Sequence, residues 1–206
     1  QPEYLKPGDE VAIVSPSFCI DESKLVKAVF FLEAWGLRVR VGKYASKKNG
    51  PFAVSDEERL SDLQEMTNDP AIKAVICSRG GYGISKIINR IDFSALKNNP
   101  KWYVGFSDIT VLLNWLNEVC GIMSIHGDMA LNFYNHEKTK STFISLKQAL
   151  FGELLALEWK GKFFRTENAT GEITGGNLSL ICSLTGTSAE PSTKGKILFM
   201  EEVGEY

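Results

Sequence analysis

The sequence has no long apolar run, no excess of charge of one sign and few cysteines. No run approaches the roughly 18 apolar residues of a membrane-spanning helix, so we expect a soluble protein without a membrane partner. With 23 basic and 25 acidic residues and no basic cluster, nucleic acid is not expected as a partner. The four cysteines include no C-x-x-C pair, which predicts reduced thiols rather than disulfides or a zinc site.

A signal segment is also missing, because the chain begins at Gln1 and no charged-then-apolar stretch follows. We therefore expect a cytoplasmic protein. The periplasm is the alternative if a signal peptide was removed before Gln1.

Short apolar runs alternate with amphipathic stretches over most of the chain. Buried strands are predicted for the runs 11–15, 72–77 and 102–104, with further strands at 38–41 and 122–125. Helices are predicted between them, and the one that follows Ser55 opens with a capping box formed with Glu58. This alternation predicts an α/β fold in which helices flank a mostly parallel sheet.

The pattern changes after residue 151. The segment 154–159 reads as a strand, the glycine-containing turn 171–176 leads into a short helix capped by Asn177, and 197–200 reads as a last strand. We predict an N-terminal α/β domain over 1–160 and the beginning of a smaller C-terminal α/β domain over 161–206. So few residues make a poor independent core, so we expect this second domain to be truncated.

Ser107 stands where a predicted strand passes through Gly105 into an amphipathic stretch. A sharp turn there would expose its hydroxyl at the carboxyl end of the strand, in front of the next backbone N–H groups, as in a nucleophile elbow. Ile109 replaces the second glycine of the usual G-x-S-x-G pattern. A serine that caps a helix is the alternative interpretation.

Three glycines lie within the segment 79–83, directly after another predicted strand. Ligands bind at the carboxyl ends of strands in open α/β sheets, and glycines let the backbone N–H groups approach a ligand closely. The segment matches neither a dinucleotide fingerprint nor a phosphate-binding P-loop. A tight turn without a ligand is the alternative.

Glu201 and Glu202 follow the predicted strand 197–200. A carboxylate at this place can orient a catalytic histidine, although a solvated acidic pair would look the same in sequence. His126 reads as a hydrogen-bonded structural residue, and His136 lies in a polar segment typical of a loop. The sequence therefore offers a nucleophile and an acid, but neither histidine has the context of a general base.

Six segments also occur in the order in which one family has them. The chain resembles the LD-carboxypeptidases, the muramoyltetrapeptide carboxypeptidase family of serine peptidases, over nearly all of its length. The segments are 5–17, ERLSDL at 58–63, RGGYG at 79–83, GFSDIT at 105–110, GGNL at 175–178 and GKILFME at 195–201.

This resemblance implies a Ser-Glu-His triad that removes the terminal D-alanine from peptidoglycan tetrapeptides during cell-wall recycling, without a cofactor or a metal. Carried over by motif, Ser107 is the nucleophile and Glu201 is the acid that orients the histidine. The backbone N–H groups of Gly81 and Asp108 are expected to form the oxyanion hole. The resemblance also implies a muropeptide substrate and a homodimer.

The resemblance places the triad histidine beyond Tyr206. His126 lies in His-Gly-Asp, where the family often has His-Gly-Pro, and is not expected to be the base. We therefore expect these 206 residues to catalyse poorly and the full gene product to be active. Two alternatives stay open: hydrolysis of an amide that joins an aminoacyl group to a nucleotide, and a non-catalytic module that binds a small ligand through the segment 79–83.

Overall fold

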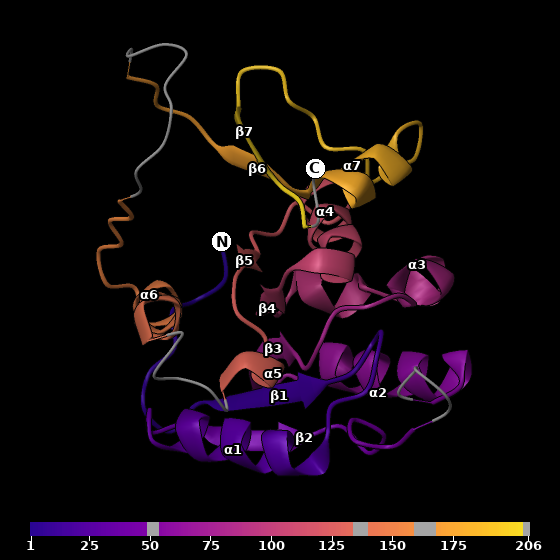
Figure 1. Ribbon diagram of the computed structural model, residues 1–206, viewed down its shortest axis with the longest axis vertical. Helices are drawn as coiled ribbons and strands as arrows, with labels where there is room; N and C mark the ends of the chain where they lie inside the picture. Colours follow the sequence, from indigo (N-terminus) through magenta and orange to yellow (C-terminus); the bar gives the residue numbers. More distant parts are fainter. Residues whose placement is uncertain (49–53, 134–139, 159–167, 204–206) are drawn as a thin grey trace.

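The computed structural model describes residues 1–48, 54–133, 140–158 and 168–203 (Figure 1). Its larger sheet has five parallel strands in the order β2-β1-β3-β4-β5, and two further parallel strands, β6 and β7, form a second sheet. The predicted α/β class with a parallel sheet is confirmed. The strands are β1 (Glu10–Val14), β2 (Arg38–Val41), β3 (Ile72–Cys77), β4 (Trp102–Gly105), β5 (Ile125–His126), β6 (Ile173–Asn177) and β7 (Ile197–Glu201).

Helices cover both faces of the larger sheet, as the alternation of strands and helices predicts. Strand residues alternate between two apolar clusters: Val75 packs on one face and Ile76 on the other. The first face is covered by α2 (Asp56–Asn68), α3 (Ile84–Ile87) and α4 (Thr110–Glu118). The second face is covered by α1 (Glu22–Glu33), α5 (Ala130–Phe133) and α6 (Lys140–Phe151). Three short 3-10 helices, η1 (Ile88–Arg90), η2 (Ser94–Lys97) and η3 (Ser107–Ile109), and the helix α7 (Leu178–Leu184) complete the described elements.

Local signals account for several of these boundaries. The capping box that begins α2 is present, since the Ser55 side chain accepts from the Glu58 backbone while the Glu58 carboxylate accepts from the Ser55 backbone. Asn177 caps α7 by accepting from the Leu180 N–H. No helix in the described ranges combines the length and the apolar character needed to span a membrane.

Two predictions after residue 151 are wrong. Residues 154–158 form no strand: Leu154 is 92% exposed and Leu157 is 62% exposed, and these apolar side chains have no strand beside them to pack against. Gly175 and Gly176, predicted in a turn, form the end of β6, because their backbone pairs with β7. The expected domain boundary falls mostly on residues outside the described ranges and stays a prediction.

The second sheet rests on α4, the helix that follows Ser107 (Figure 1). The Asn177 N–H donates to the Thr110 hydroxyl at 3.1 Å, and the Asn114 amide donates to the Gly175 carbonyl at 3.1 Å. Gly176 has φ +136°, and a Cβ there would lie 2.7 Å from Thr110 Cγ2. A glycine is therefore needed for the second sheet to approach α4 this closely.

Candidate active site

Ser107 occupies the turn between β4 and α4, where the sequence predicts a strand, a sharp turn and a helix. Its φ of +59° makes it the non-glycine residue with positive φ among those described. A serine in this left-handed region costs on the order of 1–3 kcal/mol, and such strain concentrates at functional sites. The turn is tight, since a Cβ on Gly105 would lie 2.7 Å from the Ile109 side chain.

The glycine loop 80–83 lies directly against Ser107. A Cβ on Gly80 would be 3.0 Å from Ser107 Cβ and 3.2 Å from its Oγ. Gly81 has φ +121°, and a Cβ there would meet the Phe18 ring at 2.4 Å, while the Phe18 N–H donates to the Gly80 carbonyl at 3.3 Å. The structure thus brings the predicted nucleophile and the loop that carries Gly81 together at one edge of the sheet.

Asp108 joins three loops at this edge through its side chain. Its buried carboxylate accepts from the Ser17 hydroxyl at 2.5 Å and from the Ile84 N–H at 3.2 Å. Burial raises the pKa of this carboxyl, although the hydrogen bonds and the charge of Arg59 act in the opposite direction. Sequence reasoning assigned a role to the Asp108 backbone alone, because the partners of its side chain are distant in sequence.

Arg59 lies beneath the same loops and is fully buried. It donates to the Pro16 carbonyl and forms an ion pair with Asp56. A Cβ on Gly83, whose φ is +149°, would lie 2.5 Å from Arg59 Nη1. A charged platform therefore supports the glycine loop from below, and nothing in the sequence indicates it beyond the position of Arg59 near the start of a helix.

Glu201 ends β7 and faces His126, which ends β5. The distance between Glu201 Oε1 and His126 Nε2 is 3.9 Å, too long for a hydrogen bond. The imidazole ring packs 5.0 Å from the Phe199 ring, and burial lowers the pKa of His126, which favours the neutral form. Within the described residues His126 Nδ1 has no hydrogen-bond partner, so ring packing rather than hydrogen bonding holds this histidine.

The two glutamates differ in role. The Glu202 carboxylate accepts from the Ser179 hydroxyl and N–H and from the Asn177 amide, and these bonds lower its pKa to about 2. Glu202 thus stabilises the beginning of α7, where an anion also meets the positive end of the helix dipole. Glu201 is left to face His126.

Ser107 and His126 lie on neighbouring strands. Gly105 pairs with His126 in the β4–β5 register, and Ser107 follows Gly105 by two residues. Glu201 therefore approaches the carboxyl edge of the larger sheet beside the strand that leads to Ser107. His136 lies outside the described residues, and no group of three or more potential metal ligands occurs in the ranges that the structure covers.

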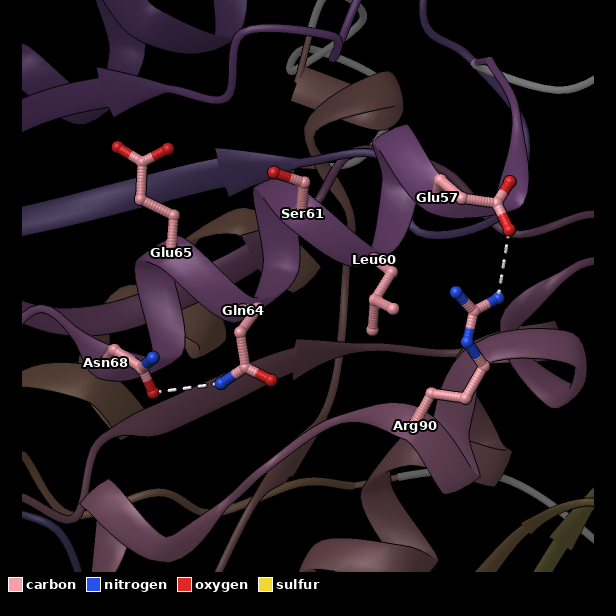
Figure 2. A pocket seen from close by; sticks show the side chains of 7 residues that line it. All are labelled: Glu57, Leu60, Ser61, Gln64, Glu65, Asn68 and Arg90. Carbon is pink, nitrogen blue, oxygen red and sulfur yellow. Dashed lines mark hydrogen bonds and ion pairs between the residues drawn. The ribbon is translucent and has the colours of Figure 1, made fainter.

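A hollow of about 480 Å³ on the surface lies elsewhere, against α2 (Figure 2). Polar side chains line it, and two contacts cross it or border it: the ion pair between Arg90 and Glu57, and the hydrogen bond between Gln64 and Asn68. None of the loops at the carboxyl edge of the sheet contributes to its lining. Its position separates it from Ser107, so we do not assign the chemistry to it.

Comparison with known proteins places this geometry in context. Residues 11–127 match the model of the LD-carboxypeptidase N-terminal domain, and residues 170–206 match that of the LD-carboxypeptidase C-terminal domain. A probable murein peptide carboxypeptidase of Bacillus subtilis is 37% identical over 220 residues, covering 100% of this chain and 66% of the relative.

Solved structures of the same kind superpose well. The muramoyltetrapeptide carboxypeptidase from Oxalobacter formigenes has a TM-score of 0.86 at 30% identity, covering 95% of this chain and 66% of that one. An MccF-like protein from Bacillus anthracis has a TM-score of 0.85 at 30% identity, covering 98% and 69%. The chain therefore spans about two thirds of the length of the proteins it matches.

Proposed function

This chain belongs to the LD-carboxypeptidase family, and from that premise we propose that its protein removes the terminal D-alanine from peptidoglycan tetrapeptides. The bond cleaved joins the L-centre of the diamino acid to D-alanine. The observation that carries the proposal is the left-handed Ser107 in a strand-to-helix turn, set directly against the glycine loop. This is the arrangement that an exposed, activated serine requires.

In the proposed reaction, the Ser107 oxygen attacks the carbonyl carbon of the scissile amide. The backbone N–H groups of Gly81 and Asp108 donate to the oxyanion that forms, and each such donor contributes about 3 kcal/mol in comparable enzymes. A base takes the Ser107 proton and passes it to the departing D-alanine nitrogen. Water then attacks the ester, which releases the shortened peptide and restores the serine.

Glu201 is proposed to orient the base. Following the resemblance, that base is a histidine beyond Tyr206, and His126 is a neighbour of Glu201 rather than the proton acceptor. The low pKa that burial gives His126 and its missing hydrogen bond to Glu201 support this, because a triad histidine is held by a hydrogen bond to its acid. We further propose a cytoplasmic homodimer that acts on muropeptides.

The test is release of D-alanine from a muropeptide tetrapeptide by the full-length gene product. Lysine-containing and diaminopimelate-containing substrates should both be assayed beside the Ser107→Ala variant. Ser61→Ala is a matched control, because Ser61 is an exposed serine on α2 (Figure 2). We expect release that Ser107→Ala abolishes and Ser61→Ala leaves unchanged.

Other outcomes would favour the alternatives. Failure to release D-alanine, together with cleavage of an aminoacyl–nucleotide amide, would replace the peptidase by the second hydrolase. Failure on both substrates, with a ligand bound equally by the wild type and by Ser107→Ala, would identify a binding module.

A further inference from the structure

Arg79 opens the glycine loop at the carboxyl end of β3, and its side chain is exposed. In the described part of the chain it forms no ion pair and no hydrogen bond, and its guanidinium lies over the Phe18 ring, 5.6 Å from the ring centroid. Phe18 is itself held by the loop, because its N–H donates to the Gly80 carbonyl and its ring lies against Gly81. Arg79 is therefore a supported cation whose charge no neighbouring carboxylate neutralises by direct contact.

The position of Arg79 relative to the nucleophile follows from its neighbour. Gly80 is so close to Ser107 that a Cβ there would lie 3.0 Å from Ser107 Cβ. The Cα atoms of consecutive residues are about 3.8 Å apart. Arg79 thus begins within one long side chain of the serine, at the same edge of the sheet.

Other basic residues at this edge are already engaged. Arg59 is fully buried, bound to Asp56 and to the Pro16 carbonyl. Lys48 pairs with Asp21 at 2.8 Å. The guanidinium of Arg79 is the better-placed donor for an anion that arrives from solvent, since its planar fork matches a carboxylate.

A carboxypeptidase substrate presents such an anion at a fixed place. The terminal carboxylate is separated from the scissile carbonyl carbon by the amide nitrogen and the Cα of D-alanine alone. When the carbonyl lies between Ser107 and the amide of Gly81, the carboxylate must lie within a few ångströms of the glycine loop. A serine hydrolase without a cation there would have no electrostatic reason to prefer the last residue of a peptide.

We propose that Arg79 binds the terminal carboxylate of the substrate and thereby restricts cleavage to the last residue. The inference rests on the proposed function and adds the group that makes the enzyme an exopeptidase. The Phe18 ring supports the guanidinium plane while its edge remains open for a bidentate contact. Glycine at positions 80 and 81 keeps side chains out of the space between this cation and the serine.

The experiment compares the tetrapeptide with the same peptide ending in D-alaninamide, which lacks the negative charge. With the full-length protein we expect kcat/KM to favour the free acid by roughly 10²-fold. In Arg79→Gln, kcat/KM for the acid should fall to the value for the amide, so that the preference disappears. Arg79→Lys should keep part of the preference, since it retains the charge but loses the fork.

Arg90→Gln is the matched control, because Arg90 is another exposed arginine and pairs with Glu57 at the surface hollow (Figure 2). It should keep the full preference, and thermal unfolding should show that each variant is folded. An unchanged acid-to-amide ratio in folded Arg79→Gln, or a wild type that cleaves both peptides equally, would overturn the inference and leave the peptidase intact. A wild type that cleaves neither peptide would refute the proposed function and this inference with it.

Discussion

Replacing Gly80 by alanine tests whether the glycine loop is set against the nucleophile. The added methyl group would lie 3.0 Å from Ser107 Cβ and 3.2 Å from Ser107 Oγ. Favourable contact between carbon atoms begins near 3.5 Å, so one of the two groups must move by about 0.5 Å. The backbone of Gly80 itself accepts alanine, because its φ does not lie in the positive region.

The structure indicates how this movement is shared. Ser107 has little freedom, since it is held at positive φ in a turn where Gly105 contacts the Ile109 side chain. The displacement therefore falls on the Ser107 hydroxyl rotamer and on the amide of Gly81. Catalytic groups tolerate about 0.5 Å, and a misplacement of 1 Å costs about 10²-fold in rate. We expect kcat to fall by about 10²-fold in Gly80→Ala.

The cost in stability should be smaller. Overpacking costs about 1–3 kcal/mol, and the stiffer unfolded chain returns about 0.4–1 kcal/mol. A net loss of about 1–2 kcal/mol lowers the melting temperature by roughly 2–8 °C in a chain of this size. Gly80→Ala should thus remain folded at the temperature of the assay.

The assay pairs D-alanine release with the rate at which a fluorophosphonate labels Ser107 in the full-length protein. Gly171→Ala is the control, because a Cβ there would have its nearest neighbour, the Gly195 carbonyl oxygen, at 3.5 Å, an ordinary contact. Wild-type release and labelling in Gly80→Ala would refute the reasoning, since the loop could not then lie where the distances place it. Loss of folding in Gly80→Ala would refute the estimate of its stability.

Three further predictions follow from the same contacts. Ser107→Gly should exceed Ser107→Ala in free energy of unfolding by about 1 kcal/mol, because glycine relieves the positive φ; equal urea midpoints would contradict this. Burial lowers the pKa of His126, so its contribution to stability is complete above pH 6.5 and is lost as the pH falls through the lowered pKa, with Glu201 as the facing acid. His126→Gln should therefore melt with a weaker acid dependence than the wild type, and loss of fluorophosphonate labelling in this variant would instead make His126 the base. Asn177→Ala should lose about 1 kcal/mol with the α7 cap, and Asn177→Ser should recover most of it in thermal melts; an Asn177→Ala variant as stable as the wild type would show that the cap contributes nothing.

The sequence predicts the larger sheet well because its signals are local. A buried parallel strand is a short apolar run, and the Ser55–Glu58 capping box spans one turn of helix. Pairing is not local, and both errors in the C-terminal part come from it. Gly175 and Gly176 look like a turn until β7 lies beside them, and Leu154 looks like part of a strand although no partner strand is present within the described residues.

The same distinction applies to the candidate site. Ser107 and Gly81 each stand directly after a strand, so a parallel sheet places both at one edge without any knowledge of tertiary contacts. The contact of Asp108 with Ser17 joins residues 91 positions apart, and that of His126 with Glu201 joins two different sheets. No periodicity or motif spacing encodes such contacts, so the sequence alone could not predict them.

The joint between the two sheets explains how a distant acid can serve the nucleophile. Thr110 lies three residues after Ser107, and its hydroxyl accepts from the N–H of Asn177, the residue paired with Glu201 in the β6–β7 register. The position of Glu201 is thus referred to the helix that begins at the nucleophile itself. A tilt of the second sheet would pivot at this contact, so Glu201, close to the pivot, would move less than the far end of β7. The geometry between serine and acid is therefore protected where the two sheets meet, and Thr110 and Asn177 are the residues on which that protection depends.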